Sequence, residues 1–199
     1  MSESPRDENA SAPTIKRLGR EIRWDAAAAI IASLVGLLAL AVAGYTAYIQ
    51  RQQVRAQVWP YLLMAKSNAG GRYELTAINK GVGPVIVRSV QVLVDGKPVP
   101  DWKALDHLSG FKPSGEFVLS TLNQTVLAPG DQVHWIRFDN AADINAFVAG
   151  WVRLHAEAQV CYSSTLGESW ILTYQPDSGT NRREVSSCPN LPIDMQFDG

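Results

Sequence analysis

The alternation of apolar and polar positions divides this chain into three parts. Residues Ala26–Ile49 form a run without a charged side chain, in which the polar groups are the hydroxyls of Ser33, Thr46 and two tyrosines. As an α-helix this run is about 36 Å long, which exceeds a hydrocarbon core of roughly 30 Å. Before it the chain is short and charged, and from Val58 onward the apolar period changes from 3.6 residues to 2. We therefore expect one membrane-spanning helix followed by a mainly β domain.

Short apolar runs separated by Gly, Pro, Asn and Asp predict strands joined by turns. Asp95-Gly96 is a hairpin-type turn, Asp101–Leu108 has the pattern of one or two helical turns, and Asn140–Gly150 that of a short helix capped at Asn140. This number of short strands favours an immunoglobulin-like antiparallel β-sandwich, with a small barrel as the other solution. The expected strands are Trp59–Lys66, Arg72–Asn79, Val85–Val94, the extended run Phe117–Leu127, Gln132–Asp139, Trp151–Tyr162 and Ser169–Gln175.

The chain is expected to divide into five segments. Thr14–Asp25 mixes basic and apolar residues, which fits either an interfacial helix or a solvated basic flank. Good helix formers follow Ile49 until Pro60 bars continuation of the helix. The segments are a disordered, basic cytoplasmic tail (1–25), a transmembrane helix (26–49), a helical stalk (50–57), an immunoglobulin-like β-sandwich (58–175) and a C-terminal tail tied by a disulfide (176–199).

The charges that flank the apolar run predict its orientation. Four basic residues precede the run closely, whereas Arg51 and Arg55 follow it. The positive-inside rule then predicts a cytoplasmic N-terminus and a periplasmic C-terminal domain, held in the inner membrane of a bacterium. A cleaved signal peptide is the competing interpretation, because Ala41-Val42-Ala43 resembles a cleavage site. The inverted topology, with the domain in the cytoplasm, is a third.

Net charge excludes a nucleic-acid surface as the expected function. From Gln57 onward the chain has 11 Lys and Arg against 14 Asp and Glu, a net charge of −3. The lipid bilayer, through residues 26–49, is the one partner that the sequence predicts directly. Any further partner is expected to be another envelope protein or a second copy of the chain.

Cys161 and Cys188 are predicted to form a disulfide. In the expected strand Trp151–Tyr162, Cys161 falls on the polar side, where an unpaired cysteine in an exported domain is a liability. Two free thiols in a reducing compartment are the alternative. The apolar side of that strand holds Val152, Leu154, Ala156, Ala158, Val160 and Tyr162, and the polar side holds Trp151, Arg153, His155, Glu157, Gln159 and Cys161.

Three turn motifs occur in an order known from one family. They are Asn79-Lys80-Gly81-Val82-Gly83-Pro84, then Asp95-Gly96 after an apolar strand, and then Leu127-Ala128-Pro129-Gly130-Asp131. Over roughly Tyr73 to Phe138 the chain resembles bacterial immunoglobulin-like domains of the CARDB type. The resemblance implies a β-sandwich that acts as an extracytoplasmic adhesion or spacer module, and it brings no active site.

Catalytic and metal-binding motifs are incomplete, and no cofactor is expected. His155-Ala156-Glu157 matches the H-x-E of zinc deaminases, but the P-C-x-x-C that must follow is missing. Asp106, His107 and Ser109 lack the G-x-S-x-G turn that exposes a nucleophile.

We therefore expect a membrane-anchored interaction or structural module without catalytic activity. Its partner-binding surface is expected on loops, with Trp102 as an exposed anchor. The alternative is an envelope enzyme or metal-binding protein that uses the polar strand face around His155 and Glu157. The residues expected to bind a partner are Asp101, Trp102, Ser163, Thr165 and Glu168.

Overall fold

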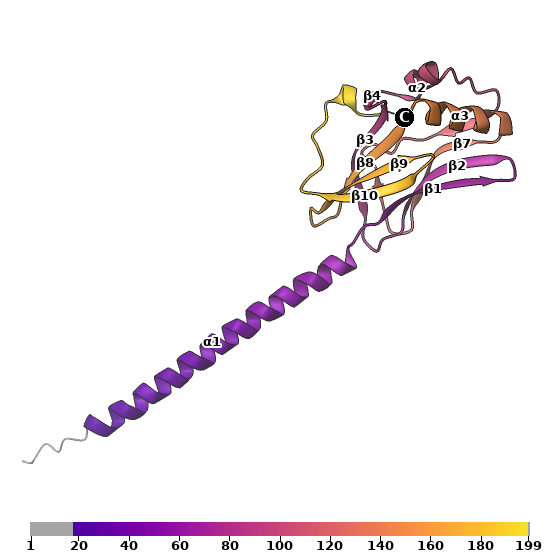
Figure 1. Cartoon of the computed structure of the whole chain (residues 1–199). Helices are drawn as coiled ribbons and strands as arrows, with labels where there is room; N and C mark the ends of the chain where they lie inside the picture. The colour runs from indigo at the N-terminus through magenta and orange to yellow at the C-terminus, as the bar shows by residue number, and fades with distance from the viewer. Residues whose placement is uncertain (1–17, 199) are drawn as a thin grey trace, which may run out of the picture. The chain divides into compact units, whose positions relative to one another are not determined.

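The computed structural model describes residues 18–198, which fall into two compact units that meet between Arg51 and Gln52. Most of the first unit is helix α1 (Leu18–Gln57), which runs on into the second (Figure 1). Its stretch from Trp24 to Gln57 is long and apolar enough to span a membrane, a property that signal sequences share. Of the disordered tail expected at residues 1–25, residues 1–17 lie outside the described part of the chain, and residues 18–25 belong to helix α1.

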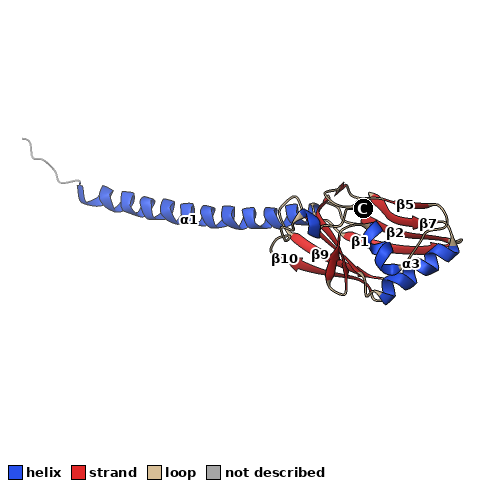
Figure 2. Ribbon diagram, turned by 90° about the horizontal axis from the view of Figure 1, so that it is seen from above, coloured by secondary structure: helices blue, strands red, loops and turns tan. Residues whose placement is uncertain are grey.

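The second unit contains two antiparallel sheets, as the apolar pattern predicted (Figure 2). One has the strand order β1-β2-β7-β5, and the other has the order β10-β9-β8-β3-β4, with β6 paired to β3. The strands are β1 (Leu62–Ala69), β2 (Arg72–Asn79), β3 (Val85–Val94), β4 (Lys97–Val99), β5 (Phe117–Leu119), β6 (Val126–Leu127), β7 (Gln132–Phe138), β8 (Glu157–Ser163), β9 (Ser169–Gln175) and β10 (Gly179–Val185).

Each of two short helices follows a side chain that caps it, and of these caps the one at Asn140 was predicted. Asp101 accepts a hydrogen bond from the Ala104 N–H at the start of α2 (Trp102–Ser109), at 2.7 Å. Asn140 accepts from the Ala142 N–H at the start of α3 (Ala141–Arg153), at 2.9 Å. Both caps satisfy backbone donors that the first helical turn leaves free.

The core lies between the two sheets and is rich in aromatic side chains at one end. Alternate residues of β2 are buried, and the Tyr73 hydroxyl reaches that of Tyr174 on β9 at 3.5 Å. Helix α3 packs against β2 and β7. The aromatic cluster at this end contains Trp102, Phe111, Trp135, Phe138, Phe147, Trp151 and Phe197.

The predicted strand Trp151–Tyr162 is wrong in its first half. Helix α3 extends to Arg153, because Ile144, Phe147 and Trp151 recur at helical spacing and bury one face against the core. His155 has a positive φ of 44°, and strand β8 begins only at Glu157. The predicted alternation therefore applies from Glu157 onward.

Two other segments differ from expectation. The extended run Phe117–Leu127 is broken into β5 and β6. The segment expected to be a C-terminal tail (176–199) contains strand β10, which pairs with β9 along its whole length. Phe197, close to the C-terminus, is buried in the aromatic cluster, and the Phe197 N–H donates to the Val90 carbonyl at 2.8 Å.

Candidate functional site

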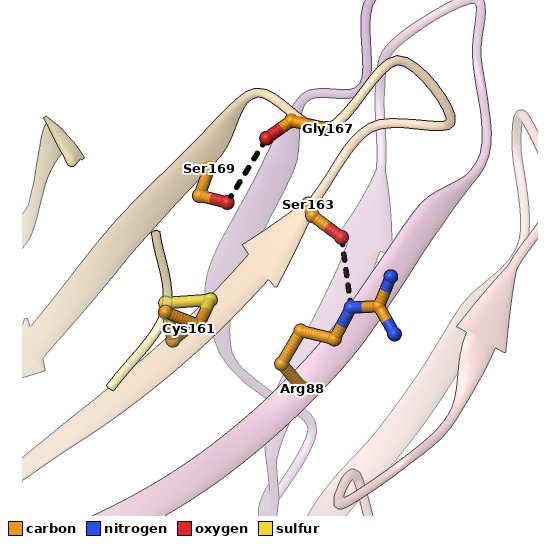
Figure 3. Close-up of a disulfide and its surroundings, with 6 residues drawn as sticks. Arg88, Cys161, Ser163, Gly167 and Ser169 are labelled. Carbon is orange, nitrogen blue, oxygen red and sulfur yellow. Dashed lines mark hydrogen bonds between the residues drawn. A yellow bond between two sulfur atoms is a disulfide. The ribbon is translucent and has the colours of Figure 1, made fainter. Parts of the chain in front are cut away.

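Cys161 and Cys188 form a disulfide in the structure, with their sulfur atoms 2.07 Å apart (Figure 3). Cys161 lies on the side of β8 opposite to the core-facing Ala158 and Val160, as predicted. It is nevertheless only 3% exposed, since the C-terminal segment carrying Cys188 covers it. The strand period thus predicted on which side of the sheet Cys161 lies, but it did not predict that the C-terminal segment covers this residue.

Trp102 is not the exposed anchor that the sequence predicted. It is 5% exposed, and its ring centroid lies 5.1 Å from that of Trp135 and 4.7 Å from that of Phe197. Trp102 and Leu105 share the buried face of α2 because they are three residues apart. Asp101, the predicted neighbour in the binding surface, serves as the helix cap.

A shallow groove of about 500 Å³ remains beside α2. The groove borders β4, an edge strand in which Pro98 has no N–H to donate to an added strand. On another side of α2, burial raises the pKa of Asp106 to about 6. The groove residues are Pro98, Val99, Pro100, Asp101, Lys103, Ala104, His107 and Leu108.

The predicted residues of the β8–β9 loop lie at the opposite end of the domain from α2. The buried Ser163 hydroxyl accepts a hydrogen bond from Arg88 Nε at 2.9 Å (Figure 3). Glu168 forms an ion pair with Arg55 at 2.9 Å, and Thr165 is exposed at the tip of the loop. Asp101 and Trp102 therefore do not form one surface with Ser163, Thr165 and Glu168.

The polar strand face does not bring His155 and Glu157 together. His155 Nδ1 lies 3.1 Å from Asp95 Oδ1 in the solvent. The Glu157 carboxylate accepts hydrogen bonds from the amides of Gln159 and Gln175, at 2.8 and 2.9 Å, and borders a hollow of about 430 Å³. Among residues 18–198, no group of three or more His, Cys, Asp or Glu side chains is placed to hold a metal ion.

The structural role of Asn79, whose side chain connects several segments, was not predicted from the sequence. It is fully buried, and its Nδ2 donates to the carbonyls of Gly83 and Leu127 at 2.8 and 3.0 Å. Its Oδ1 accepts from the N–H groups of Gly81 and Tyr61, at 2.9 and 3.4 Å. One side chain therefore joins three separate segments: the chain before β1, the β2–β3 loop and β6.

The β2–β3 loop lies directly on the backbone that leads into β1. The N–H groups of Val82 and Gly83 donate to the Trp59 carbonyl at 3.0 and 3.1 Å. A Cβ atom on Gly83 would lie 1.9 Å from the Val58 carbonyl oxygen, so only glycine fits this approach. The Asn-Lys-Gly-Val-Gly-Pro motif was the signal available in the sequence, and it serves this close packing.

We call the end of the domain that holds this contact the stalk end. It consists of residues 58–61, the β2–β3 loop (80–84) and the β8–β9 loop (164–168). Apolar side chains are exposed on all three segments, with Trp59 at 52%, Val82 at 62% and Leu166 at 48%. The Arg182 guanidinium lies 4.2 Å from the ring centroid of Tyr61 and 6.0 Å from that of Trp59.

No protein-family model, curated protein or solved structure matches the chain. The likeness to CARDB-type domains consequently rests on the turn motifs alone.

Proposed function

We propose that this chain is a single-pass protein of a bacterial inner membrane, with an immunoglobulin-like interaction module in the periplasm. The module acts by binding another envelope protein or a second copy of itself, without catalysis. The observation that carries the proposal is the presence, in one chain, of a 34-residue apolar helix and a disulfide in the domain that follows it. Structural disulfides persist in oxidising compartments.

The strand order supports the immunoglobulin-like assignment. In that fold, strands A-B-E-D form one sheet and G-F-C-C′ the other. The order β1-β2-β7-β5 corresponds to A-B-E-D, and β9-β8-β3-β4 corresponds to G-F-C-C′. Helix α3 is then an insertion between E and F, and β10 an addition after G.

Binding is favoured over catalysis because the candidate polar groups already have structural partners. Asp101 caps α2, Ser163 holds Arg88, and Glu157 accepts two amide hydrogen bonds. An exposed loop side chain such as that of Thr165 has no such task and is available to a partner.

Reporter fusions test the location of the domain. Alkaline phosphatase, which needs disulfides to fold, should be active when fused after Gly199, and a reporter that is active only in the cytoplasm should be silent there. The opposite pattern at Gly199 would establish the inverted topology. A purified chain that begins at Gly44 would establish a cleaved signal peptide instead of an anchor.

Site-specific crosslinking tests the interaction role. A photoreactive amino acid at Thr165 should give a discrete crosslinked product in intact membranes, and mass spectrometry then identifies its second component. The same probe at exposed Val118, away from the β8–β9 loop, is the matched control. Identical products from both positions would contradict a specific surface at the loop.

A further inference from the structure

The register of the strands places every segment of the stalk end together. Leu62 pairs with Asn79 where β1 begins and β2 ends, and Ile86 pairs with Ser163 where β3 begins and β8 ends. The exposed Trp59, Val82 and Leu166 flank these positions along the chain, so the three side chains lie at one end of the domain. Exposed large apolar side chains on three separate loops at one end indicate a surface with a partner.

Chain length limits what fits against this end, if the apolar helix is the anchor that we propose. Ile49 and Trp59 are about ten residues apart, which as helix is roughly 15 Å. The headgroup region on one side of a bilayer takes up about 5–7 Å of that distance. The space left between the lipid headgroups and the stalk end is thinner than a folded domain, and a tilt of the helix reduces that space further.

We propose that the stalk end is a lipid-contact surface that rests on the headgroups of the outer leaflet of the same membrane. Trp59 and Tyr61 contribute amphipathic rings of the kind enriched at membrane interfaces, and Val82 and Leu166 contribute loop tips without charge. This proposal rests on the proposed anchoring, and it names lipid as a partner of the domain itself.

Charge on and around the stalk end is mixed. Glu168 pairs with Arg55 at 2.9 Å and Glu184 borders Trp59, while Lys80 and Arg88 are basic side chains that can meet anionic lipid. Lys80 precedes the Val82 tip and is exposed. The Ser163 hydroxyl, at the end of β8, accepts a hydrogen bond from Arg88 Nε, and the terminal nitrogens of the guanidinium are directed away from that bond (Figure 3). Both cations are placed to meet phosphate groups, which attract basic side chains within a Debye length of the surface.

Fluorescence quenching in nanodiscs tests the contact on the full chain. The Trp24→Phe protein is placed in phosphatidylcholine discs that contain a lipid with a nitroxide on its headgroup. Trp102, Trp135, Trp151 and Trp170 are buried, with Trp170 the most exposed of them at 9%, so Trp59 is the exposed indole that remains in the described domain. We expect quenching that is largely lost on adding Trp59→Phe.

Paired variants separate the stalk end from exposed apolar residues elsewhere. Val82→Ser with Leu166→Ser should reduce the quenching of Trp59. Leu108→Ser with Val152→Ser, at equally exposed positions on α2 and α3, should leave it unchanged. Near-UV circular dichroism that matches the parent protein shows that each variant is folded.

Lipid charge supplies the second readout. Replacing part of the phosphatidylcholine with phosphatidylglycerol should increase the quenching, and Lys80→Gln with Arg88→Gln or high salt should remove that increase.

Trp59 emission unaffected by the nitroxide lipid in discs that retain the protein would overturn the proposal. Trp59 protected from iodide without nitroxide quenching would identify a second copy or a protein as the occupant. Protein that sodium carbonate extracts from membranes would instead refute the anchoring itself.

Discussion

Replacing Asn79 with Ala tests whether this side chain holds the stalk end together. Asn79 makes three hydrogen bonds of 2.8–3.0 Å and a longer one to the Tyr61 N–H, all in a buried setting. At a net value of about 1 kcal/mol for each good hydrogen bond, the substitution should cost about 3 kcal/mol of unfolding free energy. For a domain of this size that is a fall in melting temperature of roughly 9 °C.

The measurement is thermal and urea unfolding of the full chain in detergent, followed by tryptophan fluorescence. Asn68→Ala, on the exposed end of β1, is the matched control and should change stability by less than about 0.5 kcal/mol. A loss below about 1 kcal/mol for Asn79→Ala would refute the reasoning, because the carbonyls of Gly83 and Leu127 would then not depend on the amide.

Asn79→Asp sharpens the test because it keeps the shape and removes the two N–H donors. Its carboxylate would lie against the carbonyls of Gly83 and Leu127, and burial would raise its pKa in the folded state. A carboxyl group whose pKa is higher in the folded state than in the unfolded state binds more protons in the folded state. The variant should therefore lose stability as the pH rises through the folded-state pKa. A variant with the same stability at acid and neutral pH would contradict the buried geometry.

Three further predictions concern the C-terminal segment and α2. Cys188→Ser should lower the unfolding free energy by about 3.5 kcal/mol under non-reducing conditions, since a loop of 27 residues opens; recovery of both cysteines as free thiols from membranes would contradict the pairing. Phe197→Ala should cost about 3–5 kcal/mol in urea unfolding, whereas exposed Ile193→Ala should cost little. Asp106, with its pKa raised to about 6 by burial, makes the parent lose stability as pH rises from about 4 to 6, and Asp106→Asn should abolish that loss.

Local patterns in the sequence correctly predicted features that depend on a single helix or strand. The period of two in β2 placed Tyr73 and Leu75 in the core, and Asn140 caps α3 as predicted, whereas Asp101, expected to bind a partner, caps α2. The boundary of α3 failed for a local reason as well. The apolar positions in residues 151–154 fit both the period of 2 of a strand and the last turn of a helix. In the structure, the contact of Trp151 with Phe147, one helical turn earlier, favours the helix.

The candidate surfaces were harder to predict because they depend on distant segments. Trp102 stands in a polar stretch, and its burial follows from Trp135 and Phe197, which come from β7 and the C-terminus. The importance of Asn79 depends on Leu127, 48 residues away, and on the chain before β1. A single sequence contains the residues of such contacts but not their pairing.

Cys161 shows how both kinds of information combine. The strand period correctly separated it from the apolar face of β8, and the reasoning that an outward cysteine needs a partner led to Cys188. The C-terminal segment is then fixed twice, by this disulfide and by Phe197 in the aromatic cluster. Between the two points, Gln91 Nε2 donates to the Met195 carbonyl at 3.1 Å. A chain of low apolar content is thus ordered across a polar sheet face because both of its ends are held, and this is why Cys161 is buried without belonging to the core.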